Sequence, residues 1–393
     1  MRAIGSGLFM LERQFNVTHT QRVIFTRDVF ARANSTLREL LATAQTGSRP
    51  TRALVFIDSH VHESRPKLLR DLESYAVAHA DVIELAGAPV IIAGGESCKN
   101  NFALVEQCWA AINEAALDRH SFVFIIGGGA VLDLVCFAAS TAHRGIRHVR
   151  FPTTTLSQGD GGVGVKNGVN YFGKKNWVGT FSVPHAIVND FAFLDTLPQR
   201  EKRCGLIEAI KVALIRDAEF YNWLESHAQD LAALNKAAVE YAVQRSAELH
   251  TEHIATSGDP FEQGSARPLD FGHWAAHKLE QVSNFSIAHG EAVAIGMALD
   301  LIYSVKAGIL DSATAHRIIA LIQHIGFAIF SPLLLEQNQN GALVILAGLE
   351  EFREHLGGEL TVTLVPEIGK KIEVHKMDAR LIISALEQLR DHS

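Results

Sequence analysis

Three side chains suited to holding a divalent cation lie in three separate segments with helical periodicity. Glu208 lies within GLIEAIKVALI, His273 opens HWAAHKLE, and His289 begins HGEAVAIGMALD. A carboxylate and two imidazoles leave coordination positions open, which is typical of a catalytic Zn²⁺ site. The chain has 19 histidines, so a structural role is the better interpretation for any one of them alone. Three helices that each offer a ligand from an apolar face together predict a metal site.

Two of these segments carry a second polar residue at helical spacing. Lys211 follows Glu208 by three residues, and His277 follows His273 by four. Residues three or four apart share one face of a helix. We therefore expect Lys211 and His277 to face the same site as the metal ligands.

Glycine turns after two β-like runs could approach a phosphate. FVFII is followed by Gly127–Asp133 (GGGAVLD), and VII is followed by Gly94–Lys99 (GGESCK). Glycines at the start of a helix let its backbone N–H groups approach a pyrophosphate. Asp58, at the end of an earlier run, could bind a ribose hydroxyl. The first turn is not the strict G-x-G-x-x-G pattern, and a simple tight turn explains it about equally well.

A longer glycine-rich run, TTTLSQGDGGVGVKNGVNYFGKKN (153–176), contains six glycines together with Asp160, Lys166, Lys174, Lys175 and Asn176. Ammonium groups bind oxyanions, whereas carboxylates and amides bind hydroxyls, so the run could hold a phosphorylated polyol. The alternative is a solvated flexible loop. Arg144 precedes this run, and on its own it is best interpreted as a surface arginine.

The elements that must position these residues fall into two kinds. Buried strands are predicted at 53–58, 89–94, 122–129 and 148–154, with helical patterns at 65–80 and 100–117 between them. This alternation predicts an α/β domain over residues 1–196, built on a parallel sheet with ligands at the strand C-ends. Residues 8–30 are expected to form an opening hairpin or edge pair.

From about residue 197 long amphipathic segments dominate, at 201–227, 231–255 and 289–308. They predict a mostly α-helical second domain over residues 197–393, which would carry the metal and the substrate. A strand at 360–366 and a final helix are expected to close it.

The overall composition excludes several classes. The net charge is −7, which argues against a nucleic-acid binder. There is no apolar run of about 18 residues and no signal-like start, so no membrane partner is expected. The four cysteines (Cys98, Cys108, Cys136 and Cys204) form no Cys-x-x-Cys motif, which suits a reducing compartment and predicts a cytoplasmic enzyme.

Taken in order along the chain, these strings resemble the sugar phosphate cyclase superfamily, whose best-known member is 3-dehydroquinate synthase. The resemblance rests on GGGAVLD, HRGIRHVRFPTT, GDGGVGVKNGVN, GKKN, LIEAIKVALI, DPFEQGSARPLDFGH and HGEAVAIG. It implies a dinucleotide-binding α/β domain followed by a helical metal-binding domain, and it implies NAD and zinc as cofactors, with cobalt or iron as other possible metals.

The resemblance also implies roles for individual residues. Zinc would be held by Glu208, His273 and His289. The residues that it places near NAD⁺ are Asp58, Glu96, Lys99, Gly128, Gly129, Asp133, Thr153, Thr154, Thr196 and Glu201. Those that it places on the substrate hydroxyls and phosphate are Asp160, Lys166, Lys175, Asn176, Lys211 and His277. Arg144 would reach the phosphate held by a neighbouring subunit, which implies a homodimer.

The implied chemistry is a phosphate-eliminating cyclisation. Zinc polarises a carbon–oxygen bond, and NAD⁺ removes a hydride to give a ketone that acidifies the neighbouring C–H. Phosphate leaves, the hydride returns, and ring opening followed by an intramolecular aldol step closes a carbocycle.

The chain departs from 3-dehydroquinate synthase where that enzyme binds the substrate carboxylate. Counting back from His273 without a gap puts Glu252 at the family's Lys and Ala266 at its Arg, and Asp270 replaces an Asn. Arg267 could substitute for the missing Arg. Since a Glu would repel a carboxylate, we expect a phosphorylated seven-carbon substrate without that group.

Sedoheptulose 7-phosphate, the substrate of epi-valiolone-type synthases, fits this expectation best. His277 is retained, although such synthases often have Pro there, and the chain most resembles the dehydroquinate-synthase-like members of ebo gene clusters.

Three other functions are compatible with the sequence. One is 3-dehydroquinate synthase proper, and another is a metal-dependent polyol dehydrogenase of the glycerol dehydrogenase type. The lysine-rich run and Arg144 argue against the second, because a phosphate-free polyol would not need them. A third is a non-catalytic binding protein, which the intact metal set and Lys211 argue against.

Overall fold

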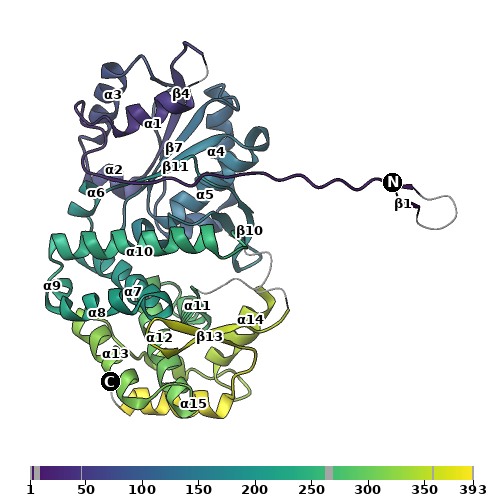
Figure 1. The fold of residues 1–393 in the computed structure, drawn as a ribbon, viewed down its shortest axis with the longest axis vertical. Helices are drawn as coiled ribbons and strands as arrows, with labels where there is room; N and C mark the ends of the chain where they lie inside the picture. Colours follow the sequence, from purple (N-terminus) through teal and green to yellow (C-terminus); the bar gives the residue numbers. More distant parts are fainter. Residues whose placement is uncertain (1, 4–8, 46, 262–268, 356–357, 392–393) are drawn as a thin grey trace.

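The computed structural model describes residues 2–3, 9–45, 47–261, 269–355 and 358–391. An α/β half and a helical half are stacked along the long axis, with the long helix α10 (Lys236–Thr256) lying between them (Figure 1).

The α/β half is built on a parallel sheet of seven strands. These are β3 (Val23–Thr26), β4 (Thr51–Asp58), β5 (Ile83–Leu85), β6 (Val90–Ile92), β7 (Phe122–Gly127), β8 (Arg147–Pro152) and β11 (Ala186–Asp190). Their order is β3-β11-β8-β7-β4-β5, and β6 pairs with the C-terminal part of β4. Parallel strands covered on both faces are apolar along their whole length, and β7 is buried throughout.

Two separate apolar clusters lie on opposite faces of this sheet. Along β4, Val55 and Ile57 belong to one cluster, and Leu54 and Phe56 belong to the other. This alternation follows from the two-residue period of a strand. Helices α1 (Thr36–Ala44) and α3 (Leu68–Ala78) cover the first face, and α4 (Phe102–Glu114) and α5 (Gly129–Thr141) cover the second.

The helical half surrounds two helices that are buried on nearly all sides, α7 (Gln199–Arg216) and α12 (His289–Lys306). Helices that are apolar all round belong in the interior. Around them lie α8 (Ala218–Ser226), α9 (Ala228–Ala232), α10, α11 (His273–Val282), α13 (Ser312–Ile325), α14 (Ala347–His355) and α15 (Ala379–Asp391). The hairpin β12 (Val362–Glu367) and β13 (Lys370–Val374) packs against α7 and α12.

The remaining elements are short. They are β1 (Arg2–Ala3), β2 (Phe9–Met10), α2 (Ser59–Ser64), η1 (Glu96–Asn100), η2 (Ala142–Arg144), η3 (Ser157–Gly161), β9 (Lys166–Tyr171), β10 (Lys174–Phe181), α6 (Ala192–Asp195), η4 (Pro332–Leu335) and η5 (Val344–Leu346). No helix in the described ranges is long and apolar enough to cross a bilayer.

The parallel sheet and the helical second half confirm the predicted fold class. The hairpin or edge pair predicted over residues 8–30 is wrong: β2 pairs with β1, and β3 instead joins the sheet edge parallel to β11. The helical pattern over 201–227 is divided at Asp217, which leaves the helical conformation and caps α8. The sheet ends at Asp190 and α7 begins at Gln199, and the domain boundary at 196/197 stays a prediction.

Candidate active site

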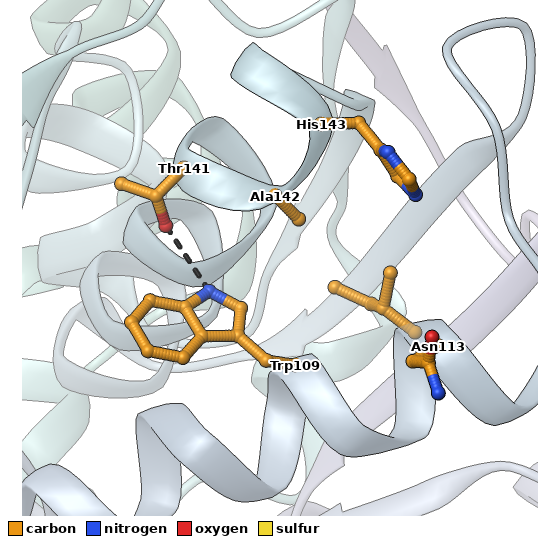
Figure 2. Close-up of a pocket in the computed structure, with 6 residues that line it drawn as sticks. Trp109, Asn113, Thr141, Ala142 and His143 are labelled. Atoms are coloured by element: carbon orange, nitrogen blue, oxygen red, sulfur yellow. Dashed lines mark hydrogen bonds between the residues drawn. The ribbon is translucent and has the colours of Figure 1, made fainter.

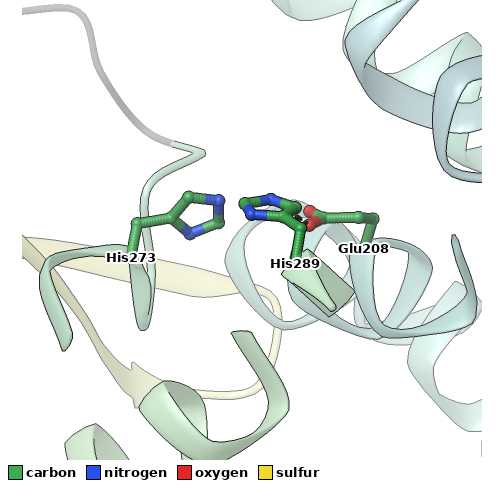
Figure 3. A group of neighbouring side chains, drawn as sticks. All are labelled: Glu208, His273 and His289. Atoms are coloured by element: carbon green, nitrogen blue, oxygen red, sulfur yellow. Dashed lines mark ion pairs between the residues drawn. The ribbon is translucent and has the colours of Figure 1, made fainter. Parts of the chain in front are cut away.

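The three predicted metal ligands come together at one point. Donor atoms of Glu208 on α7, His273 at the start of α11 and His289 at the start of α12 all lie within 4.8 Å of one another. Figure 3 shows the three side chains pointing toward one another from separate helices. We call these three residues the triad. The convergence predicted from the sequence is thus confirmed, whereas their role as ligands stays a prediction.

The Glu208 carboxylate is almost completely buried, at 1% exposure. Its oxygens lie 2.5 Å from Lys211 Nζ and 3.4 Å from His289 Nε2, yet neither oxygen has a hydrogen bond of good geometry in the described chain. A buried carboxylate with unsatisfied oxygens is costly unless a cation completes its environment. The donor set therefore fits a divalent metal with N and O ligands.

A close backbone contact sets the position of the two histidine helices. Gly272, just before His273, has φ +77°, and a Cβ there would lie 2.6 Å from the Met297 nitrogen on α12. Opposite it, a Cβ on Gly296 would lie 2.0 Å from the Gly272 oxygen. Only glycine fits at both points.

Asp300 on α12 forms two hydrogen bonds to the start of α11, where the two helices are in contact. Its two carboxylate oxygens accept hydrogen bonds from the Gly272 backbone N–H at 3.0 Å and from Trp274 Nε1 at 2.9 Å. Burial raises the pKa of Asp300 to about 7, although the two hydrogen bonds act in the opposite direction.

Both triad histidines have their second ring nitrogen occupied. His273 Nδ1 donates to the Phe271 carbonyl at 3.0 Å, because a carbonyl can only accept. His289 Nδ1 lies 3.1 Å from Glu280 Oε2. Such partners fix the tautomer and leave Nε2 available to a metal. Burial opposes protonation of His289, but the carboxylates of Glu280 and Glu208 raise its pKa to about 9, so proton and metal compete for this ring.

Glu280 is a site residue that the sequence reasoning missed. It is 3% exposed, and besides His289 it contacts Lys175 Nζ at 3.0 Å through Oε1. Positions 273, 277 and 280 are spaced i, i+4 and i+7 on α11, so the periodicity that singled out His277 could also have found it. His277 lies beside the triad, 5.4 Å from His273 between ring centroids. Burial, followed by the charge of Lys175, holds the pKa of His277 well below its ordinary value.

Lys211, which was expected on the same face as Glu208, meets Asp160 on the other side of that carboxylate. Lys211 is 2% exposed, and its Nζ lies 3.4 Å from Asp160 Oδ2. Burial opposes both charges, but the attraction of the neighbouring groups raises the pKa of Lys211 and lowers that of Asp160. A fixed ammonium thus lies between two carboxylates, next to the point where a metal would bind.

The structure corrects the placement of Glu252. It is exposed on α10, whereas His250, two residues earlier, lies 2.5 Å from Asp160 Oδ1 through its Nδ1. Two residues along an α-helix correspond to a rotation of about 200°, so His250 and Glu252 lie on opposite faces. Ala266 and Arg267 lie outside the described residues. The charge of Asp270 contributes to the raised pKa of Lys211, whereas burial keeps the pKa of His273 below its ordinary value although Asp270 acts in the opposite direction.

The glycine-rich run after β8 is an ordered turn followed by a hairpin, not a flexible loop. Asp160 lies in η3, and β9 and β10 carry Lys166, Lys174, Lys175 and Asn176. Lys166 is exposed at the start of β9. Lys174 reaches across to Glu354 on α14 at 2.8 Å. The hairpin thus connects the α/β half to the helical half beside the triad.

The side chain of Arg150 on β8 donates hydrogen bonds to the backbone of this turn. The sequence did not single out this residue. Its guanidinium is 1% exposed and donates to the carbonyls of Gly162 at 3.0 Å and Gly164 at 2.6 Å. It also donates to Asn167 Oδ1 at 2.5 Å and to Cys136 Sγ at 3.2 Å. The one signal was an arginine inside an apolar strand pattern, HVRFP. A buried guanidinium that donates to backbone carbonyls fixes the path of the chain between Asp160 and Lys166.

The predicted dinucleotide residues and hairpin residues form one polar network. Lys99 is 2% exposed, and its Nζ donates to Asp133 Oδ2 at 2.6 Å and to Asn176 Oδ1. Glu96 lies 3.9 Å from both Lys99 and Lys175. The predicted NAD and substrate residues therefore adjoin, as hydride transfer between the two would require.

Gly128 caps α5, and Gly129 begins it. Nothing lies within 4 Å of where a Gly129 Cβ would be, so the start of α5 is open to a ligand. Asp58 ends β4 with its carboxylate against Gly94, where a Cβ would come within 2.2 Å of Asp58 Oδ1. Burial raises the pKa of Asp58. The carboxyl ends of parallel strands are where dinucleotides bind in such sheets, so these residues lie where the sequence predicted the NAD site.

Thr153 and Thr154 follow β8 at the same edge. The Thr153 N–H donates to the Gly127 carbonyl at 3.0 Å, and Thr154 Oγ1 is 2.8 Å from Ser157 Oγ. Thr196 and Glu201 lie further along, and the Glu201 side chain is exposed. Thr155 joins the two regions by donating to the Glu201 carbonyl at 3.1 Å.

Arg144 is exposed in η2, and no contact within the described ranges links it to the triad. It has φ +63° and follows His143 at φ +49°, a conformation that is strained for side chains other than Gly. A cavity of about 190 Å³ opens beside it between α4 and η2, lined by Trp109, Ile112, Asn113, Thr141, Ala142 and His143 (Figure 2). The contact of Arg144 with a neighbouring subunit stays a prediction.

Comparison with known proteins agrees with this geometry. The model of the 3-dehydroquinate synthase N-terminal domain matches residues 89–204, and that of the C-terminal domain matches residues 205–343. A 2-epi-5-epi-valiolone synthase of Streptomyces glaucescens is 36% identical over 302 residues, covering 76% of each chain. A 3-dehydroquinate synthase of Geobacter sp. (strain M21) is 40% identical over 256 residues, covering 65% of this chain and 70% of its own.

Among solved structures, the fold is similar to that of ValA, a 2-epi-5-epi-valiolone synthase from Streptomyces hygroscopicus with NAD⁺ and Zn²⁺ bound. The TM-score is 0.83 at 27% identity, and the match covers 98% of this chain and 100% of that one. The two domain models together span more than half of the 393 residues, and the chain is a member of the 3-dehydroquinate synthase family of sugar phosphate cyclases.

Proposed function

We propose that this protein is an NAD- and zinc-dependent cyclase that converts sedoheptulose 7-phosphate to an epi-valiolone-type cyclitol with loss of phosphate. The single observation that carries the proposal is the triad, with Lys211 and Asp160 on one side and Lys175 on the other. This arrangement provides a metal site, groups for hydroxyls and a cation for phosphate within one contact network.

The residues present suit both cofactors. Glu208, His273 and His289 would hold the metal, and the open start of α5 with Asp58 and Asp133 would hold NAD. When bound, the metal polarises a substrate carbon–oxygen bond, and NAD⁺ accepts a hydride that it later returns.

The chain's own residues bind and orient the substrate and move protons. Asp160 accepts hydrogen bonds from substrate hydroxyls, and its position is fixed by Lys211 at 3.4 Å. The Lys211 ammonium stabilises negative charge that develops on oxygen as the neighbouring C–H becomes acidic. His277, kept neutral by burial and by Lys175, can accept a proton near the triad.

The β9–β10 hairpin provides the side chains for phosphate binding. Lys175 Nζ contacts only the carboxylates of Glu280 and Glu96 among the described residues, so it is oriented and available to a phosphate. Lys166 lies on the neighbouring strand. Arg144 of a second copy would complete the phosphate site, and we accordingly propose a homodimer.

The choice of substrate rests on the groups near Asp160. A substrate carboxylate beside Asp160 and Asp270 would need a cation besides Lys211, which already lies against Glu208 and Asp160. Hydroxyl groups need no such cation. This supports a ketose phosphate over the keto-acid phosphate that 3-dehydroquinate synthase uses.

The test is phosphate release from each substrate by the purified, metal- and NAD-loaded protein. We expect turnover of sedoheptulose 7-phosphate and none of the seven-carbon keto-acid phosphate. The opposite result would establish 3-dehydroquinate synthase activity, the second candidate, which the 40% identity to a 3-dehydroquinate synthase favours. Net accumulation of NADH with a polyol would instead indicate a dehydrogenase.

A further inference from the structure

The residue of α10 that reaches the site is His250, and neither the sequence reasoning nor the similarity to relatives assigned it a role. Its side chain is 14% exposed, and its Nδ1 lies 2.5 Å from Asp160 Oδ1. Nδ1 has no hydrogen bond of good geometry among the described residues, and since a carboxylate can only accept, Asp160 is the acceptor within reach when Nδ1 carries the proton.

The packing of α10 against η3 holds the imidazole in place. A Cβ on Gly159 would meet Ser246 Oγ at 3.4 Å, and one on Gly164 would meet His250 Nε2 at 3.9 Å. Ser246 and His250 are four residues apart and share the face of α10 that covers the glycine turn. The ring thus packs against the η3 turn at ordinary van der Waals distance, on the side where it meets Asp160.

The two oxygens of Asp160 are therefore approached from opposite elements. Oδ1 faces His250 on α10, and Oδ2 faces Lys211 on α7. A carboxylate has about four lone-pair positions, so two remain for substrate hydroxyls, in directions that the two contacts fix.

We propose that His250 is a positioning and specificity-determining residue. It orients Asp160 toward the hydroxyls of a polyol phosphate. Because the side chain there is an imidazole and not a lysine ammonium, the subsite has no lysine to pair with a substrate carboxylate. This inference rests on the proposed function, which it deepens by naming the residue that selects the substrate class.

The matched variants are His250→Asn, His250→Gln and His250→Ala. An Asn amide N–H occupies roughly the place of Nδ1–H, whereas a Gln amide reaches the place of Nε2. We expect His250→Ala and His250→Gln to lose about ten- to a hundredfold in kcat on sedoheptulose 7-phosphate, and His250→Asn to recover most of it. A role in packing alone would not distinguish Asn from Gln, so equal losses in the two would overturn the proposal.

A second pair tests the choice of substrate. His250→Lys should raise the ratio of kcat/KM for the keto-acid phosphate over that for the ketose phosphate by about tenfold or more, because it supplies the missing cation. Glu252→Lys is the control, since that side chain is exposed on the opposite face of α10. Equal shifts in the two variants, or a shift in Glu252→Lys alone, would refute the assignment.

A readout without turnover separates this inference from the proposed function. The ¹⁵N resonances of His250 in the intact protein should show an Nδ1–H hydrogen-bonded to a carboxylate, and Asp160→Asn should remove that signature. If the wild-type protein shows the signature but turns over neither substrate, the proposed function is wrong and the contact stands. If it turns over the ketose phosphate while His250 lacks the signature, the positioning role is wrong.

Discussion

The triad and the predicted substrate side of the site are built differently. Each triad member projects from an end or the middle of a buried helix, and its second contacts are to Phe271, Glu280 and Lys211. The substrate side is formed by a hairpin, a glycine turn and one face of α10, all held together by single long side chains. Helix packing therefore fixes the metal-binding end of the site, whereas substrate choice depends on a few replaceable side-chain contacts.

The largest effect is expected when the Glu208 carboxylate is removed from the triad. Glu208→Gln keeps the shape but leaves the metal with two histidines and the Lys211 ammonium without its nearest partner. We expect kcat/KM to fall at least about a thousandfold, or about 4 kcal/mol, with loss of bound metal. Phosphate release and metal content after gel filtration measure both effects. Glu252→Gln is the control, and a Glu208→Gln protein that keeps metal and activity would disprove the assignment.

The second test asks whether the substrate side depends on one buried side chain. Arg150→Met leaves the carbonyls of Gly162 and Gly164 without their donor in a buried place. We expect the free energy of unfolding to fall by about 3 kcal/mol, measured by urea denaturation.

The matched control is Arg38→Met, since Arg38 pairs with Asp81 at the exposed surface. It should change the free energy of unfolding by no more than about 0.5 kcal/mol. Similar effects in the two variants would show that Arg150 does not hold the turn.

The third test concerns Glu280, the residue that connects the triad with the β9–β10 hairpin. Glu280 contacts both His289 and Lys175, so Glu280→Gln removes the charge that makes the His289 ring a better ligand. We expect about ten- to a hundredfold weaker metal binding, measured by competition with a chelator. Glu291→Gln is matched to it, because Glu291 lies on the first turn of α12 and pairs with Arg200 outside the triad. Unchanged metal affinity in Glu280→Gln would exclude the link.

The smallest effect concerns pH and the junction of α11 with α12. The pKa of Asp300 is about 7 in the folded chain, above its ordinary value of 3.8, because of burial. The folded state therefore binds this proton more tightly, and the stability that it contributes is lost as pH rises from about 4 through 7.

Asp300→Asn cannot titrate, which makes it the reference. The free energy of unfolding of the wild type, taken relative to that of Asp300→Asn, should fall by about 1 kcal/mol per pH unit between pH 5 and 7. Urea denaturation of both proteins at three pH values measures it. Parallel pH profiles would show that Asp300 does not titrate in this range.

Helical spacing within a single helix predicted the site well. Glu208 with Lys211 and His273 with His277 share faces as expected, and Glu280 follows from the same rule. The β-like runs 53–58 and 122–129 were found because strands buried on both faces are apolar throughout.

Counting back from His273 failed for Glu252. Glu252 was placed by counting back from His273 through residues 262–268, which lie outside the described ranges, and the phase of α10 puts His250 in the site instead. Arg150 could not be assigned because its burial depends on elements distant in sequence. The β9–β10 hairpin was obscured because glycine and lysine suggested a loop.

The contact between Gly272 and Gly296 has a consequence for the choice of ion. Because the two backbones already touch, the helices that carry His273 and His289 cannot move closer together around a smaller cation. The main chain thus sets how closely the two helices that carry these histidines can approach each other. A metal site whose ligands cannot move closer together favours cations of a matching radius. Replacing either glycine by alanine should therefore change the relative affinities of the site for divalent cations.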